Sequence, residues 1–115
     1  MNFTELNNRV IKWADDKGIL TNATPLTQHS KTQEEVEELS EALFYQSKDE
    51  REYINTKGVL CTTSDEIEDA IGDILVTVLI QARLQNLDPL ACLETALDII
   101  EKRTGKMENG TFVKD

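Results

Sequence analysis

The sequence predicts an all-α protein, an antiparallel bundle of four main helices that is completed by oligomerisation. Apolar residues recur at three- and four-residue spacings in successive segments, as on one face of an α-helix. The chain has 5 glycines and 2 prolines among 115 residues, so few positions interrupt a helix. The run Ile74–Ile80 is apolar on nearly every side. A helix of that kind must be covered all round, and three other helices of one chain cover it poorly.

The first two helices are indicated by their ends as well as by their apolar period. One runs from about residue 4 to residue 17, with Thr4 as a candidate N-cap and Gly18 as a natural stop. A polar turn over residues 21–24 follows. Thr24-Pro25 then opens the second helix, because proline suits the first helical position, and this helix continues to about residue 46.

The third helix is expected over about residues 64–87. Its centre, Ile74–Ile80, could be a buried strand if taken alone, but the flanking apolar residues keep the helical period without a break. The fourth helix begins at Asp88-Pro89 and ends near Gly105.

The remaining segments predict no further regular structure. Residues 47–62 are interpreted as a loop with a short helical turn at 51–54, and residues 105–115 as a polar C-terminal tail. By length, residues 1–104 form a single domain.

The charge limits the possible partners. The chain carries 22 acidic and 12 basic residues, a net charge of −10. This argues against binding a nucleic-acid backbone or an anionic membrane. Small nucleotides are not excluded, because a bound cation can carry their charge.

The cellular setting is expected to be reducing. The two cysteines, Cys61 and Cys92, are too few for a disulfide framework or a zinc site. The first residues lack the basic and apolar regions of a secretion signal, and the longest apolar run is far too short to span a bilayer. We therefore expect a cytoplasmic protein.

Two acidic clusters, Glu34–Glu38 and Glu66–Asp73, lie inside the second and third predicted helices. At about 100° per residue, some of their carboxylates fall beside faces that should be buried. Clustered carboxylates repel one another unless a hard cation lies between them. Facing pairs from the two helices would supply four carboxylates, which suit one or two magnesium ions. The pattern favours metal binding for Glu38, Asp69 and Asp73.

Other roles compete for these carboxylates. Thr32 to Glu35 and Thr63 to Glu66 both fit the capping-box pattern, which explains those glutamates without a metal. A solvated face is the favoured interpretation for four others, Glu34, Glu37, Glu41 and Glu68.

Residues outside the acidic clusters give weaker signals. Lys31, Arg103 and Lys106 could neutralise phosphates, although basic residues near helix ends usually serve the helix dipole or solubility. Trp13 lies on the apolar stripe of the first helix, so we interpret it as a core residue rather than a platform for a nucleobase.

At these residues the chain resembles the MazG-like, all-α nucleoside triphosphate pyrophosphohydrolases, in particular their small phage- or plasmid-type members. Their hallmark is Glu-Glu-x-x-Glu on one helix and Glu-x-x-Asp on the next. The run Glu34–Glu38 matches the first half. Glu66-x-x-Asp69 matches the second half literally, but the apolar run that follows the family's aspartate comes after Asp73. Three residues before Asp73 the chain has Ala70, so Asp69 is interpreted as the substitute for the family's glutamate.

The resemblance implies magnesium-dependent hydrolysis of a (deoxy)nucleoside triphosphate to the monophosphate and pyrophosphate, with Mn²⁺ able to replace Mg²⁺. It implies metal ligation by four residues, Glu35, Glu38, Asp69 and Asp73. Glu34 or Glu35 would orient or deprotonate the attacking water, and Lys31, Arg103 and Lys106 would bind the substrate's phosphates. It also implies homodimers or homotetramers whose packed helices form the pocket.

A different class of function stays open from sequence alone. A non-catalytic acidic helical protein could bind a basic partner or mimic nucleic acid. That hypothesis accounts for the net charge of −10, but not for carboxylates that recur at helical spacing beside apolar faces.

Overall fold

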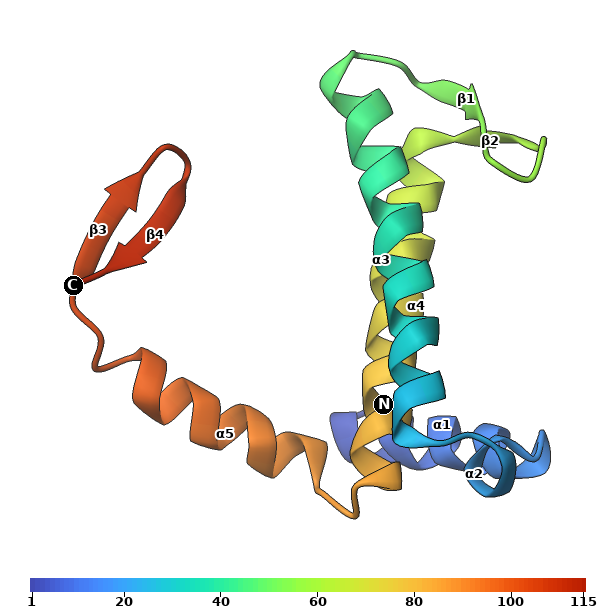
Figure 1. The fold of residues 1–115 in the computed structure, drawn as a ribbon, viewed down its shortest axis with the longest axis vertical. Coiled ribbons are helices and arrows are strands. Elements are labelled where there is room, and N and C mark those ends of the chain that lie inside the picture. Colours follow the sequence, from blue (N-terminus) through green and yellow to red (C-terminus); the bar gives the residue numbers. More distant parts are fainter.

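The structure is a computed structural model that describes all 115 residues, of which 65% are helical. The elements follow in the order α1 (Phe3–Asp16), α2 (Ile19–Asn22), α3 (Pro25–Ser47), β1 (Glu52–Ile54), β2 (Leu60–Thr62), α4 (Thr63–Leu84), α5 (Pro89–Ile100), β3 (Gly105–Glu108) and β4 (Thr111–Lys114). The strands form two separate antiparallel hairpins (Figure 1). The prediction of an all-α protein is therefore wrong, although most of the chain is helical.

The ends of α1 and α3 are set by side chains. Asn2, rather than Thr4, caps α1, and its Oδ1 accepts a hydrogen bond of 2.9 Å from the backbone N–H of Glu5. Gly18 follows α1 with a φ of 76°, so it stops the helix as the sequence predicts. Thr24 caps α3, and its backbone and hydroxyl exchange hydrogen bonds with Thr27.

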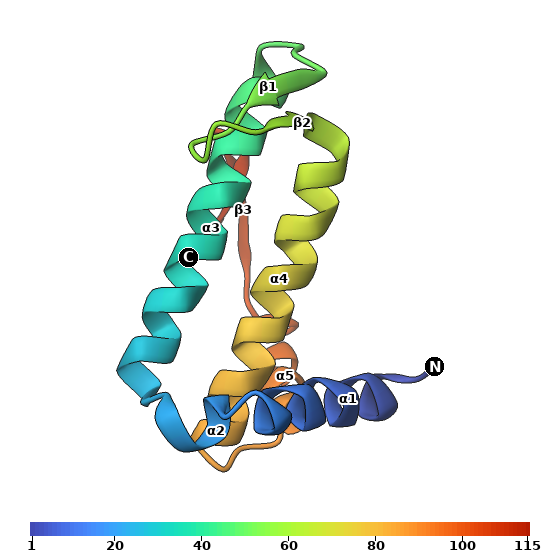
Figure 2. The same cartoon turned by 90° about the vertical axis from the view of Figure 1, so that its right-hand side faces the viewer.

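Helices α3 and α4 form a long antiparallel pair (Figure 2). At one end the Gln28 side chain donates to the carbonyl of Thr77 over 3.2 Å. At the other end the Thr63 hydroxyl donates to the carbonyl of Glu50 over 2.7 Å. The whole of Ile74–Ile80 lies within α4, which confirms a helix there rather than a strand.

The contact between these two helices is made by small and polar residues at seven-residue spacing. We call this contact the α3–α4 seam; its members are Gln28, Glu35 and Ala42 on α3 and Thr63, Ala70 and Thr77 on α4, all buried. A seven-residue repeat keeps one face of each helix against its partner. The seam therefore brings the acidic clusters of the two helices together.

A β-hairpin replaces the loop predicted for residues 47–62. Its tip is closed by Asn55, whose Oδ1 accepts from the backbone N–H groups of Lys57 and Val59 over 2.9 and 3.0 Å. Gly58 completes the turn with a φ of 79°. The local hydrogen-bonding capacity of asparagine and the freedom of glycine thus build a defined tip that presents Lys57.

The helical turn predicted at residues 51–54 is instead strand β1. Its central residue, Tyr53, is 6% exposed and stacks on Tyr45 of α3, with ring centroids 4.3 Å apart. Side chains alternate along a strand, so Tyr53 points inward while its neighbours Glu52 and Ile54 face outward. Its contact with Tyr45 holds the hairpin against α3.

The C-terminal segment also differs from its prediction as a polar tail. Helix α5 ends at Ile100 rather than near Gly105, and β3 and β4 pair through a two-residue loop of Asn109 and Gly110. Both loop residues have positive φ, 50° and 84°. An Asn-Gly pair with these angles is the favoured connection of a tight hairpin.

The expected four-helix bundle does not form within one chain. Helix α1 lies across one end of the α3–α4 pair, and α5 leads away from that pair and carries the second hairpin at its end (Figure 1). None of the helices combines the length and apolar composition needed to cross a membrane.

The buried core of the chain is small. Only 9 of 115 residues are buried, and no large side chain is fully enclosed. The buried apolar residues are Ala14, Ala42, Tyr53, Ala70 and Ile80, whereas many leucines, isoleucines and valines are exposed. The hydrophobic effect within one chain is therefore weak for a protein of this length.

The buried hydroxyl of Thr63 should contribute measurably to stability. Thr63→Val keeps the side-chain shape but removes the donor to the Glu50 carbonyl, so the free energy of unfolding should fall by about 1–2 kcal/mol. Thr62→Val is the matched control, because Thr62 is exposed and its side chain makes no capping bond. Urea denaturation followed by circular dichroism measures both; equal stability of the two variants would contradict this role of Thr63.

Candidate metal centre

Three carboxylates from facing helices converge beside the α3–α4 seam. Glu35 and Glu38 come from α3 and Asp73 from α4, and each offers an oxygen within 4.8 Å of the others. Glu35 and Glu38 are three residues apart and so share one face of α3. We call these three residues the acidic triad.

Glu35 is the most buried member of the acidic triad. The residue is 8% exposed, and its Oε2 has no hydrogen-bond partner. Burial raises the pKa of Glu35, and so do the neighbouring Glu38 carboxyl and the charge of Asp73; Lys31 lowers it by less. The ionised carboxylate is therefore held in an unfavourable environment.

The acidic triad fits a hard divalent cation. All of its donors are carboxylate oxygens, the ligands that Mg²⁺ and Mn²⁺ prefer. The unpartnered Oε2 of Glu35 gives an independent reason, because a buried oxygen without a partner is costly unless it coordinates something. Positive charge between the three side chains would relieve both the repulsion and the missing bond.

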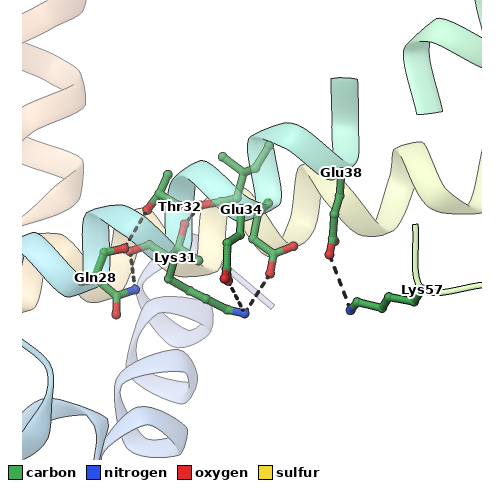
Figure 3. Close-up of polar contacts among 9 residues, drawn as sticks. Gln28, Lys31, Thr32, Glu34, Glu38 and Lys57 are labelled. Atoms are coloured by element: carbon green, nitrogen blue, oxygen red, sulfur yellow. Dashed lines mark hydrogen bonds and ion pairs between the residues drawn. The ribbon is translucent and has the colours of Figure 1, made fainter. Parts of the chain in front are cut away.

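Two lysines reach the glutamates of α3, Lys31 near Glu34 and Lys57 near Glu38 (Figure 3). Lys31 Nζ lies 3.0 Å from Glu34 Oε2 and 3.6 Å from Glu35 Oε1. Lys57 Nζ lies 3.7 Å from Glu38 Oε1. Sequence reasoning singled out Lys31 and missed Lys57, because Lys57 reaches the site only through the hairpin that was interpreted as a loop.

Asp69 is not part of the acidic triad. It is exposed, whereas Ala70 occupies the buried position of the seam. Glu66 lies four residues before Ala70 and Asp73 three after it, so both flank the same face of α4. Glu66 is half-buried and lines a cavity of about 180 Å³ together with Glu38. The structure thus brings Glu66, rather than Asp69, to the neighbourhood of Glu38.

The outer carboxylates are placed mostly as expected. Glu34, Glu37 and Glu68 are exposed, and Glu34 is held by Lys31 rather than by the triad. Glu41 differs from the predicted solvated position, because it is half-buried and lines the same cavity as Glu66.

The capping-box explanation for Glu35 and Glu66 is wrong. Thr32 lies inside α3, where its hydroxyl donates to the Gln28 carbonyl over 3.3 Å. Helix α4 begins after Thr62, whose side chain caps nothing. The seam, not a helix end, therefore determines where both glutamates lie.

An apolar cavity of about 210 Å³ adjoins the acidic triad. Glu35 and Asp73 form part of its wall, and Trp13, Ile19 and Ile80 supply apolar surface. Trp13 is 49% exposed, so its interpretation as a core residue is wrong. Its indole offers a flat surface next to the carboxylates, an arrangement that could hold an aromatic ring of a ligand.

The other two predicted phosphate-binding residues, Arg103 and Lys106, lie near the C-terminus, in a different segment from the acidic triad. Arg103 follows α5, and Lys106 lies in β3, where it pairs with Glu108 over 3.5 Å. Both belong to the segment that leads away from α3 and α4 (Figure 1). Neither therefore reaches the acidic triad of its own chain.

Comparison with protein-family models, with curated proteins and with solved structures finds no match for this chain.

Removing the charge of Glu35 should stabilise the cation-free protein. Because the folded-state pKa of Glu35 is raised, its ionisation destabilises the fold, and this destabilisation grows as pH rises through the raised pKa. In EDTA at pH 7, Glu35→Gln should raise Tm by several degrees, about 4 °C or more. The difference from wild type should disappear near the ordinary carboxyl pKa, at about pH 4.

Glu37→Gln provides the control, because Glu37 is exposed on the same helix. Thermal unfolding between acidic and neutral pH measures all three proteins. A Glu35→Gln protein that is less stable than wild type at pH 7 would contradict the strained carboxylate.

Proposed function

We propose that the protein is a MazG-like, magnesium-dependent nucleoside triphosphate pyrophosphohydrolase, which cleaves a (deoxy)nucleoside triphosphate to the monophosphate and pyrophosphate. The observation that carries this proposal is the acidic triad of Glu35, Glu38 and Asp73. Its carboxylates come from the two helices that hold the family's motif. The adjoining cavity with Trp13 gives independent support, because it can accept a base beside the phosphate-binding centre.

Glu35, Glu38 and Asp73 are the proposed ligands of Mg²⁺, or of Mn²⁺ in its place. A cation bound there would neutralise the substrate's phosphates and polarise the attacking water. Glu34 is exposed next to the triad and can orient that water or accept its proton, and Glu35 is the second candidate for this role.

The two nearby lysines can act on the phosphate chain. Lys31 lies 3.6 Å from Glu35 and Lys57 lies 3.7 Å from Glu38, and Lys31 also pairs with the neighbouring Glu34 over 3.0 Å. A phosphate that enters the site can replace these carboxylates as their partner. The lysines would then stabilise the charge that develops on the departing pyrophosphate.

A base is expected to stack on Trp13. The cavity that contains Trp13 also contains Gln28, which is buried and fixed by its hydrogen bond to Thr77. Glu35 and Asp73 line the same cavity. A nucleotide whose base stacks on Trp13 would therefore have its phosphates near the triad.

The alternative, an acidic protein that binds a basic partner, is supported by the charge of −10 but does not explain the triad. A mimic of nucleic acid needs its carboxylates at the surface, where a partner can reach them. Glu35 is instead only 8% exposed, and its pKa is raised. Mg²⁺-dependent pyrophosphate release from the common nucleoside triphosphates separates the two functions; no release from any of them would favour the alternative.

Charge-removing substitutions in the triad test the site. Asp73→Asn and Glu38→Gln keep the side-chain shape but remove a proposed metal ligand, so kcat/KM should fall by about 100-fold or more. Glu37→Gln should leave activity unchanged, because Glu37 is exposed outside the triad. Pyrophosphate release and Mn²⁺ binding should be measured together. Equal activity of Asp73→Asn and Glu37→Gln would defeat the assignment.

A second comparison decides between the two carboxylates of α4 that lie outside the triad. Glu66→Gln should lower activity more than Asp69→Asn, since Glu66 shares a cavity with Glu38 whereas Asp69 is exposed. The same pyrophosphate assay compares the two variants. The opposite order would show that Asp69 substitutes for the family's glutamate, as the sequence alone suggests.

A further inference from the structure

Residues 89–115, which comprise α5 and the β3–β4 hairpin, form an arm that packs on almost nothing in its own chain. The arm leaves the end of α4 and extends away from the α3–α4 pair (Figure 1). The hydrogen bonds of the hairpin, including that from the Thr104 hydroxyl to Asp115, stay within the arm. We call this segment the C-terminal arm.

The direction of the C-terminal arm is fixed by the connection that precedes it. Asn86 closes α4 with a φ of 56°, and the backbone N–H of Leu87 donates to the Ala82 carbonyl over 2.9 Å. Asp88 then caps α5 by accepting from the N–H of Leu90. Hydrogen bonds at both ends of this connection between α4 and α5 hold α5 away from its own α4.

Helix α5 presents an apolar stripe that its own chain leaves uncovered. Four residues at helical spacing are 37–58% exposed: Leu90, Leu93, Leu97 and Ile100. Glu94 and Asp98, four residues apart, border this stripe on one side. A helix of this kind is built to bury one face against another apolar surface.

Helix α4 carries a matching stripe. Ile71, Leu75 and Val78 follow one another at helical spacing and are 49%, 59% and 47% exposed. The α3–α4 seam, in contrast, buries polar residues such as Glu35 and Thr77. The pair of helices therefore buries four polar side chains beside only Ala42, Ala70 and Ile80, while it exposes larger apolar side chains, which is unfavourable in a monomer.

The exposed area agrees with a missing partner. The chain exposes 8756 Å², whereas a monomer of 13.0 kDa exposes about 6,300 Å². The radius of gyration is 16.9 Å, against about 13 Å for a compact domain of this length. An excess of roughly 2,400 Å² in each of two chains is the size of an obligate dimer interface.

The end of the C-terminal arm and the rest of the chain differ in the sign of their net charge. Residues 1–88 contain 8 basic and 17 acidic residues, a net charge of −9. Residues 102–115 contain 4 basic and 2 acidic residues, a net charge of +2. The end of the arm is therefore attracted to the acidic part of a second chain.

We infer that two copies of this chain exchange their C-terminal arms. The α5 stripe of each copy packs on the α4 stripe of the other, and the end of the arm carries Arg103 and Lys106 to the other copy's acidic triad. The placement of Arg103 and Lys106 at the triad rests on the proposed function, because their role at the triad would be to bind phosphate. The site of each chain is then completed in trans.

Cross-linking tests the exchange without any assay of activity. Cys92 is exposed on α5 and supplies one thiol, and Leu75→Cys in a Cys61→Ser chain supplies the other on α4. A short bismaleimide is applied to a mixture of ¹⁴N- and ¹⁵N-labelled chains. Exchange predicts peptide pairs of mixed isotope composition between Cys92 and position 75. Pairs from single chains alone would show an arm that folds back on its own chain and would overturn the inference.

Oligomeric state gives a second, independent test. The full chain should be a dimer or a larger assembly by light scattering at micromolar concentration, and Leu93→Asp with Leu97→Asp should shift it to smaller species. Glu94→Gln with Asp98→Asn is the control at polar positions of α5 that border the stripe, and it should leave the assembly intact. A monomeric wild-type chain, or an apolar-face variant that assembles like the control, would overturn the inference.

Mixing two defective chains tests the role of Arg103 and Lys106. One chain carries Glu38→Gln; the other carries Arg103→Ala and Lys106→Ala. After subunit exchange, completion in trans predicts recovery toward about a quarter of wild-type activity, the statistical share of intact sites. No recovery in confirmed mixed assemblies would overturn completion in trans. An inactive wild-type chain would instead overturn the proposed function, and cross-linking would still decide the exchange.

Discussion

The α3–α4 seam is the contact on which the rest of this structure depends. Its small members, Ala42 and Ala70, let the two backbones approach closely, and its polar members lie between them. Because the repeat is seven residues, the same face stays inward over the length of both helices. Glu35 is buried because it falls on this repeat, and Glu38 and Asp73 lie beside it for the same reason.

A seam of this kind gives little hydrophobic stabilisation. Most of its members contribute either a single methyl group or a polar side chain, and burial of Glu35 raises its pKa because the charged form is disfavoured. The large apolar side chains of α4, such as Leu75, remain on the outside. The fold therefore places polar side chains, Glu35 among them, where other proteins place an apolar core.

The helices could be predicted from the sequence because their apolar period is long and unbroken, even where Ile74–Ile80 imitates a strand. The hairpins could not, because strands of three or four residues are too short to show a period. Turn signals were present at Asn55–Gly58 and at Asn109-Gly110, but a turn alone does not reveal which flanking residues pair.

For the site, the residue pattern favoured Glu38 on α3 as a metal ligand, and the family resemblance added Glu35, three residues before it on the same helix. The partner residues on α4 depend on which face turns toward α3, and that is decided by Ala70 in the seam. Asp69 precedes the buried Ala70 by one residue and so lies about 100° away from it around the helix, whereas Glu66, four residues before Ala70, lies about 40° away. Asp69 is accordingly exposed and Glu66 half-buried. Lys57 could not be predicted from the sequence, because its contact with Glu38 depends on how the β1–β2 hairpin packs against α3.

Helix α4 would link the proposed cation site to the proposed assembly. Asp73 of the acidic triad lies between Ile71 and Leu75 in sequence, but it points to a different side of the helix from the apolar stripe. A partner that covers the stripe therefore need not cover the triad, although it restrains the same two turns of α4. Restraint of the helix fixes the carboxylate of Asp73 against those of α3, and a site for a small, strongly hydrated cation depends on such fixed spacing. The proposed assembly and the proposed cation site would thus favour the same conformation of α4, so each should strengthen the other.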